Sequence, residues 1–432
     1  MRKKTKRIKK KKAEKLQKLN TVKGTKDHYG QMAVNYDFVL DKFKMFCDFF
    51  NFEKISTPIL EYEDVFIKTL GVSSDIISKE MYNFVDQGGD KLVLRPEGTA
   101  SVVRALISNS LQESHNKNFY YYGPMFRRER PQAGRLRQFH QVGVEVFGGR
   151  SFMDDIKVII LAEKFLTSIG IRKELFLQIN SLGNLESRNK YVNELKKFLK
   201  SNFSLLSEES KKKIDSNTLR ILDSKNEKDI KILDSSPKIN DFLDDESKLF
   251  FKKIIDALTG LNISFEINPL LVRGLDYYNH TTFEYIFSDK KSQNAILAGG
   301  RYDGLVKSMG GSDLAGVGWA AGMERILMLL NYNEKAKKII SFFSTSDNLD
   351  ENILKVFNNI PPLKFISLNI IDGKTFKKKM IKANKIKSFG CIIFGDDEWK
   401  QKKIIWKNFK DSSQKIFPTE ELNKFLKKLD HA

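Results

Sequence analysis

Cysteine and long apolar runs are scarce in this chain of 432 residues. The two cysteines, Cys47 and Cys391, are far apart and fit no zinc-ligand or redox spacing, so we expect a reducing, intracellular setting. No apolar run approaches the roughly 18 residues that a membrane helix needs, and the N-terminus lacks the apolar segment of a secretory signal. These absences favour a cytoplasmic protein without a membrane partner.

Positive charge is abundant instead, with a formal net charge of +21. Residues 1–20 hold eleven Lys or Arg and one Glu, a block typical of a disordered basic arm. Its lack of Ser and its two arginines fit an arm that touches nucleic acid better than a mitochondrial transit peptide, and both alternatives stay open. A Lys-rich proteome would produce the same excess, so charge alone is weak evidence for a nucleic-acid partner.

The chain divides into segments of different pattern. Residues 21–330 contain hairpin signals and few crossover helices, which predicts an α+β domain with an antiparallel sheet. Residues from about 184 to 262 interrupt it with charged helical periodicity and no strand signal, as in an inserted helical module. After a linker at 331–337, short strands alternate with helical stretches over 338–432, as in a separate α/β domain.

Several elements can be predicted within these domains. "EKISTPILEYEDVF" (53–66) reads as a strand broken at Pro58. "MYNFVDQGGDKLVLRPEGTA" reads as a hairpin with a Gly-Gly turn, followed by a helix that Thr99 caps. In the last domain four runs read as strands, "KIISFF", "KFISLNI", "GCIIFG" and "KKIIWKN", before a final helix from Thr419 to Leu429.

The stretch "FRRERPQAGRLRQFHQ" (126–141) places five arginines between two strand-like runs. Guanidinium groups grip phosphate oxygens in pairs, and Phe139 could stack on a base. Gln141 and Glu145 follow at even spacing, so both point to one face of a strand, where polar groups are costly unless they bind something. A solvated basic loop is the plain alternative.

Arginines and carboxylates recur together elsewhere. Any one group could be a structural ion pair, but together they suit a polyphosphate and a small zwitterion bound side by side. The groups are "LRPEGTA" with Arg95, Glu97 and Thr99, "LVRGLDYYN" with Arg273, Asp276, Tyr277 and Tyr278, and "GMER" with Arg325.

On these residues the chain resembles the histidyl-tRNA synthetases of the bacterial type, within the class II aminoacyl-tRNA synthetases. "KISTPILEYEDVF" resembles class motif 1, "GPMFRRERPQAGRLRQFHQVGVEVFG" motif 2 and "GVGWAAGMERI" motif 3. "LVRGLDYYN" and "LAGGRYDGL" resemble two histidine-specific segments, and the resemblance runs from Thr21 to the C-terminus. "TVKGTKDHYG" departs from the family pattern, and the basic arm lies outside it.

The resemblance implies a class II antiparallel-sheet catalytic domain with a helical insertion, and a C-terminal α/β domain that binds the anticodon. It implies that L-histidine reacts with ATP, accompanied by Mg²⁺, to give histidyl-adenylate and pyrophosphate. Transfer of histidine to the 3′ end of tRNA(His) then releases AMP. It also implies a homodimer with motif 1 at the interface.

The resemblance assigns a role to each matching residue. Arg127 and Arg273 are catalytic and flank the α-phosphate, and no metal is held by the protein itself. Arg130 and Gln132 meet the tRNA acceptor end. The ATP-binding set is Arg127, Glu129, Phe139 and Arg325. The histidine-binding set is Glu97, Gly98, Thr99, Arg127, Gln141, Glu145, Arg273, Tyr277 and Tyr278.

Three other readings compete with this one. A catalytically inactive paralogue, serving as a regulatory subunit in histidine biosynthesis, would usually have lost the motif 2 and motif 3 arginines and the anticodon domain. A class II synthetase for another amino acid would not need "RGLDYY" together with Glu145. A plain RNA-binding protein would leave the carboxylates on the strand face unexplained.

Overall fold

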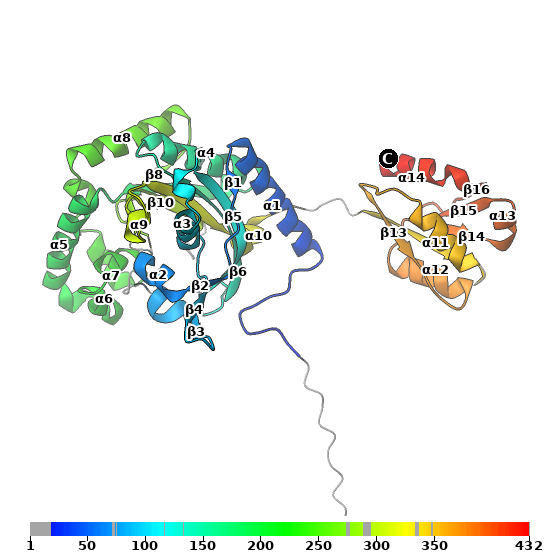
Figure 1. Cartoon of the computed structure of the whole chain (residues 1–432), viewed down its shortest axis with the longest axis horizontal. Coiled ribbons are helices and arrows are strands. Elements are labelled where there is room, and N and C mark those ends of the chain that lie inside the picture. Colours follow the sequence, from blue (N-terminus) through cyan, green and yellow to red (C-terminus); the bar gives the residue numbers. More distant parts are fainter. Residues whose placement is uncertain are drawn as a thin grey trace, which may run out of the picture. The chain divides into compact units, whose positions relative to one another are not determined.

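The computed structural model describes residues 19–70, 74, 76–115, 117–132, 134–273, 277–287, 295–332, 337–346 and 349–431. These fall into two units, Met1–Tyr332 and Asn333–Ala432 (Figure 1). The expected basic arm lies almost wholly outside the described residues, as do most of the expected linker and Asp276. Among the described residues, no helix is long and apolar enough to cross a membrane.

Unit 1 is built on an eight-stranded sheet in the order β1-β5-β6-β11-β10-β9-β7-β8. Neighbouring strands run antiparallel, except at the two edges, where β1–β5 and β7–β8 are parallel. This mainly antiparallel sheet confirms the expected α+β class. The strands are β1 (Glu53–Lys54), β5 (Asn118–Phe126), β6 (Gln138–Phe147), β7 (Leu175–Ser181), β8 (Glu266–Ile267), β9 (Asn279–Phe287), β10 (Ala295–Arg301) and β11 (Gly316–Gly322).

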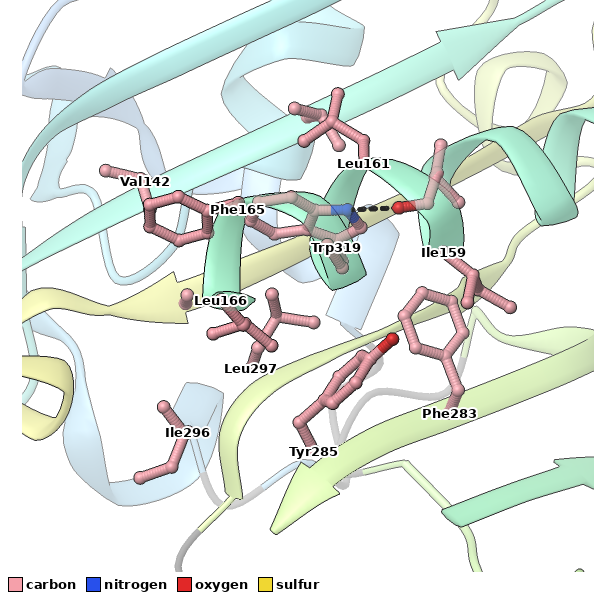
Figure 2. Packing of buried hydrophobic residues seen from close by; sticks show 14 of the residues in the cluster. Val142, Ile159, Leu161, Phe165, Leu166, Phe283, Tyr285, Ile296, Leu297 and Trp319 are labelled. Atoms are coloured by element: carbon pink, nitrogen blue, oxygen red, sulfur yellow. Dashed lines mark hydrogen bonds between the residues drawn. The ribbon is translucent and has the colours of Figure 1, made fainter. Parts of the chain in front are cut away.

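One face of this sheet is covered by helices α1 (Gln31–Phe49), α4 (Phe152–Ser168), α8 (Asp245–Gly260) and α10 (Met323–Leu329), which share its largest apolar core. Trp319 lies at the centre: its ring stacks on Phe165 at 6.3 Å, and its Nε1 donates to the carbonyl oxygen of Val158 at 2.9 Å (Figure 2). Ser151 caps α4 through its hydroxyl group. This rigid layer supports the polar face of the sheet.

The segment 184–262, all of whose residues are described, consists of α-helices and 3₁₀-helices joined by turns and contains no strand. In Figure 1 its helices α5 (Leu185–Ser201), α6 (Glu208–Lys213) and α7 (Glu227–Leu233) lie on the side of unit 1 away from α1. Its apolar side chains do not form a core of their own. Tyr191 and Leu195 belong to one buried cluster with Tyr121, Tyr278 and Tyr302 of the main sheet and its loops.

A three-stranded sheet, ordered β2-β4-β3, is formed by β2 (Leu60–Tyr62), β3 (Tyr82–Val85) and β4 (Lys91–Leu94). The expected break at Pro58 is present, because β1 and β2 lie in different sheets. The expected strand over "EDVF" is wrong: α2 (Glu63–Leu70) begins there. Its first turn holds Glu63 and Asp64, which favour a helix N-terminus, and buries Val65 and Phe66.

Unit 2 has a five-stranded sheet in the order β13-β12-β14-β15-β16. The pairings β12–β13 and β12–β14 are parallel, whereas β14, β15 and β16 run antiparallel. The sequence predicted four of these strands and missed β16, an edge strand with only Phe417 buried. The strands are β12 (Lys338–Ser344), β13 (Ile366–Ile370), β14 (Gly390–Phe394), β15 (Lys403–Asn408) and β16 (Gln414–Pro418).

The helices of unit 2 include α12 (Phe376–Lys385), whose first turn is capped by the Thr375 hydroxyl group. The final helix begins later than predicted, because residues 419–421 form one 3₁₀ turn before it. The other α-helices that the structure describes in unit 2 are α11 (Asp350–Asn358), α13 (Asp396–Lys400) and α14 (Leu422–His431).

Candidate active site

A cavity of about 740 Å³ lies in unit 1, between strands of the main sheet and the helical insertion. Arg220, Asp223 and Lys225 of the insertion line it from one side. Most of the expected site residues line it together: Glu97, Thr99, Arg127, Glu129, Phe139, Gln141, Arg273, Tyr277, Tyr278 and Arg325.

Four expected site residues do not line the cavity. Glu145 is buried behind Thr99 and contacts that residue directly. Gly98 packs so closely on Tyr121 that a methyl group there would overlap the phenol ring. Arg130 and Gln132 are exposed, in the loop between β5 and β6. The structure therefore does not bring these last two residues into the cavity.

The arginine stretch enters the cavity through Arg127. Its Nε donates to the carbonyl oxygen of Pro96 at 2.8 Å, and its guanidinium group lies 5.4 Å from the centre of the Phe139 ring. Glu129 lies beside it, 3.9 Å from Arg127 and 3.3 Å from Arg135. Two guanidinium groups and an aromatic ring therefore lie close together in the lining of the cavity.

Arg325, the third residue of α10, also lines the cavity. Its Nη1 donates to the carbonyl oxygen of Ala295 at 2.5 Å. Burial lowers the pKa of Arg325, and the positive charge of Arg135 lowers it further, although Glu129 opposes this. Arg325 and Arg135 both line the cavity, and an anion bound beside them would stabilise both charges, as in a phosphate site.

Arg273 forms an ion pair with Glu284 of β9, and both side chains are less than one-fifth exposed. Its guanidinium group lies 5.4 Å from the centre of the Tyr278 ring. Its buried Nε has no hydrogen-bond partner among the described residues. A buried donor without a partner is costly, so this nitrogen is available to an oxygen atom of a ligand.

The expected helix cap at Thr99 is wrong. Gly98 is the N-cap of α3 (Thr99–Ser108), and Thr99 is already the first helical residue. The longer side chain of Glu97 satisfies the helix end, because its carboxylate accepts from the amide nitrogens of Thr99 and Ala100 at 2.7 and 2.8 Å. The Thr99 hydroxyl group is then free to donate to Glu145 at 2.6 Å.

Glu145 lies in a buried cage of hydroxyl groups. Besides the Thr99 hydroxyl, it accepts hydrogen bonds from the hydroxyl groups of Tyr302 and, at 3.4 Å, Tyr121. Burial raises the pKa of Glu145 to about 8, against the opposing effect of these hydrogen bonds. The sequence did not single out the two tyrosines, although Tyr302 stands in "LAGGRYDGL" and Tyr121 alternates with Phe119 on β5.

Gln141 and Arg95, two polar residues singled out in the sequence, differ in their hydrogen bonding. The buried Oε1 of Gln141 has no hydrogen-bond partner among the described residues, so it is available to a donor such as an ammonium group. Arg95 is structural: its guanidinium group donates to Pro124 at 3.0 Å and to the backbone and hydroxyl of Thr57. It does not line the cavity.

Comparison with known proteins agrees with this geometry. The family model described as Histidyl-tRNA synthetase matches residues 24–326. A histidine–tRNA ligase of Rhodospirillum rubrum is 40% identical over 411 residues, which cover 94% of this chain and 98% of that protein.

Two solved structures share the fold. An apo histidyl-tRNA synthetase of S. aureus superposes with a TM-score of 0.78 at 28% identity, over 95% of this chain and 100% of that one. A Bacillus halodurans protein described as an ATP phosphoribosyltransferase regulatory subunit/histidyl-tRNA synthetase has a TM-score of 0.64 at 20% identity, over 88% and 99%, a likeness of fold alone. On the family match and the full-length relatives, the chain belongs to the histidyl-tRNA synthetase family.

Proposed function

We propose that the chain is a histidine–tRNA ligase, which activates L-histidine with ATP and transfers it to tRNA(His). The observation that carries this proposal is the shared cavity. Arg127, Arg273 and Arg325 line it together with Gln141, and Glu145 lies directly behind Thr99. Cationic groups for a triphosphate thus adjoin polar groups for an amino acid.

The first step joins two anions, because the histidine carboxylate attacks the α-phosphorus of ATP and pyrophosphate leaves. Catalysis must then come mainly from charge neutralisation and alignment. We assign Arg127 and Arg273 to the two sides of the α-phosphate. The pairing of Arg273 with Glu284 holds its guanidinium group in place before substrate binds.

The adenosine portion of ATP would lie between Phe139 and Arg325. Phe139 lines the cavity, and the Arg127 guanidinium group lies 5.4 Å from the centre of its ring. Glu129 would accept from the adenine amino group, in exchange for part of its contact with Arg135. Mg²⁺ would enter with ATP as part of the substrate, held by phosphate oxygens and water.

Histidine would be recognised at both of its ends. Gln141 Oε1, which lacks a partner among the described residues, would accept from the ammonium group, together with Glu97 and Thr99. Glu145 and Tyr278 would read the two imidazole nitrogens, with Tyr277 shaping the wall. Because Glu145 lies behind Thr99, the Thr99 hydroxyl group would have to turn aside before Glu145 could contact the ring. A side chain without two ring nitrogens would leave buried polar groups unpaired, which costs binding energy.

The second step requires tRNA and, in this proposal, a homodimer. Arg130 and Gln132 are exposed and would meet the acceptor end, whereas unit 2 would bind the anticodon through exposed lysines such as Lys377 and Lys378. The three-stranded sheet of unit 1 exposes large apolar side chains, as a subunit interface requires. These include Leu60, Tyr62, Phe84 and Val85.

ATP–pyrophosphate exchange, measured with each amino acid in turn, tests the proposal. We expect exchange with L-histidine alone, and aminoacylation when tRNA(His) is added. Absence of exchange with histidine in a folded preparation would contradict an enzyme and favour a binding or regulatory protein. Exchange with a different amino acid would retain the reaction class and contradict the assignment of Glu145 and Tyr278.

A further inference from the structure

Two histidines and a carboxylate meet beside the cavity, where three separate segments come together. His28 precedes α1, His140 lies on β6, and Glu324 is the second residue of α10. One possible ligand atom from each lies within 4.8 Å of the other two. None of the three has a role in the aminoacylation proposed above, and His28 stands in "TVKGTKDHYG", the segment that departs from the family pattern.

The side chains of this cluster are largely enclosed: His28, His140 and Glu324 are 16%, 24% and 10% exposed. The ring of Tyr36 packs against both imidazoles, with its centre 5.3 Å from that of His140 and 5.9 Å from that of His28. The amide nitrogen of His140 donates to both carboxylate oxygens of Glu324, at 2.9 and 3.1 Å. The carboxylate is therefore fixed in place before any ligand arrives.

We propose that His28, His140 and Glu324 form a binding site for one transition-metal ion, with Zn²⁺ as the best fit. Two imidazoles and one carboxylate are a ligand set that zinc accepts while keeping a fourth position open. Imidazole nitrogen suits zinc and neighbouring metals and is a poor ligand for Mg²⁺, so this site is separate from the Mg²⁺ that accompanies ATP.

The distances agree with this assignment. Zinc bonds of about 2.0–2.2 Å to nitrogen and oxygen place tetrahedral ligand atoms roughly 3.3 Å apart. Oε1 of Glu324 lies 2.9 Å from Nδ1 of His140 and 4.0 Å from Nε2 of His28. These two separations lie on either side of that value, and all three ligand atoms lie within 4.8 Å of one another, so rotation of the two rings toward the carboxylate would close the site.

A simple hydrogen bond between His140 and Glu324 is the competing explanation, and it accounts for only part of the geometry. It leaves the position of His28 explained only by ring packing on Tyr36 and His140, because 4.0 Å is too long for a hydrogen bond to Glu324. An ion between the three side chains would engage His28 at that distance. A requirement for His28 in zinc binding would therefore distinguish a metal site from a histidine–carboxylate pair.

A metal ion at this position would tie the N-terminal segment to the wall of the cavity. His140 stands between Phe139 and Gln141, and Glu324 directly precedes Arg325. The same segment already contacts the arginine stretch, because the carbonyl oxygen of Gly24 accepts from the amide nitrogen of Arg137 at 2.7 Å. Metal binding should therefore stabilise the folded chain through mass action.

The test uses the full-length chain, freed of metal and titrated with Zn²⁺ by calorimetry. Wild type should bind one zinc ion per chain and melt at a higher temperature when it is loaded. His28→Gln should bind zinc at least about tenfold more weakly and show no such rise. His115→Ala is the matched control, since His115 is an exposed histidine away from the cluster, and it should behave as wild type.

Two results would overturn the site: wild type that binds no zinc, or His28→Gln that binds zinc as tightly as wild type does. X-ray absorption on zinc-loaded wild type provides a measurement that does not depend on a variant. It should report two imidazole ligands, and a sulfur ligand or a shell of oxygen alone would refute the site. The outcome is independent of the ligase activity, so failure of either proposal leaves the other standing.

Discussion

The hydroxyl group of Thr99 donates to the carboxylate of Glu145 at 2.6 Å, which joins the first turn of α3 to the centre of the main sheet. Thr99 lines the cavity and Glu145 does not. Because the carboxylate is fully enclosed, burial raises its pKa to about 8. The protonation of Glu145 therefore links the stability of the fold to the site proposed for histidine.

The pH dependence of stability should report this link. The pKa of Glu145 is raised from 4.5 to about 8, so the folded chain retains a proton that the unfolded chain releases. The contribution of Glu145 to stability should fall as pH rises between those values and stay level above them, by at most about 1.4 kcal/mol per pKa unit. Urea unfolding at a series of pH values, for wild type and Glu145→Gln, measures the difference.

The difference between the two free energies of unfolding should shift in favour of Glu145→Gln as pH rises, since glutamine does not titrate. Glu174→Gln is the control, because Glu174 is exposed on the surface, and its profile should run parallel to that of wild type. Parallel profiles for Glu145→Gln as well would contradict a raised pKa at this residue.

Replacement of Arg273 by Ala should lower the rate of ATP–pyrophosphate exchange by about 100- to 1,000-fold, the usual loss for one charge-stabilising donor. The matched control is Arg172→Ala. Arg172 pairs with Glu163 at 2.6 Å with similar burial, 17% and 16% exposed against 16% and 18% for Arg273 and Glu284, but lies outside the cavity.

Both variants remove one partner of an enclosed ion pair, so both should lose stability. Only Arg273→Ala should lose exchange per folded molecule, measured below the melting temperature of each variant. Exchange at the wild-type rate in Arg273→Ala would contradict a catalytic role for Arg273.

Replacement of Arg130 by Ala should affect the two half-reactions unequally. Arg130 is exposed in the loop between β5 and β6, and it does not line the cavity. We expect a higher KM for tRNA in aminoacylation and a much smaller effect on amino-acid activation. Arg150→Ala, which removes an exposed arginine paired with Asp313, is the control for a general loss of positive charge. An equal loss in both half-reactions would contradict an acceptor-end role.

A methyl group at Gly98 should destabilise the fold, because it would overlap the ring of Tyr121 beside Glu145. Forcing an extra carbon into a packed interior costs roughly 1–3 kcal/mol. Gly260→Ala is the matched control: Gly260 ends α8, and a methyl group there would meet nothing within 4 Å. Chemical denaturation should show a loss for Gly98→Ala and little change, or a gain, for Gly260→Ala.

The sequence predicts β5 and β6, the two strands beside the arginine stretch, because their long apolar runs are conspicuous, but it does not predict β7 of the same sheet. It fails at β16, where only Phe417 is buried and no alternation marks an edge strand. It also fails over "EDVF", where acidic residues at a helix start outweigh the preceding strand signal.

The sequence likewise predicts one part of the candidate site and misses another. The sequence marks the charged residues, because arginine and glutamate between apolar runs are conspicuous. It cannot reveal that the Glu97 carboxylate accepts hydrogen bonds from the amide nitrogens at the start of α3, so that the Thr99 hydroxyl group can donate to Glu145. These partners depend on how far each side chain reaches in the folded structure. Tyr121 and Tyr302 look like ordinary core aromatics until their hydroxyl groups are seen on one carboxylate.

The helical insertion shares one apolar core with the tyrosines around Glu145, and this limits how the protein can be recombined with its relatives. A chimaera cut at residues 184 and 262 would separate Tyr191 and Leu195 from Tyr121 and Tyr302, which pack in the same cluster. Swapping the insertion as a cassette would therefore require its packing partners on the sheet to be exchanged at the same time. Lineages of this family should accordingly change the two surfaces together.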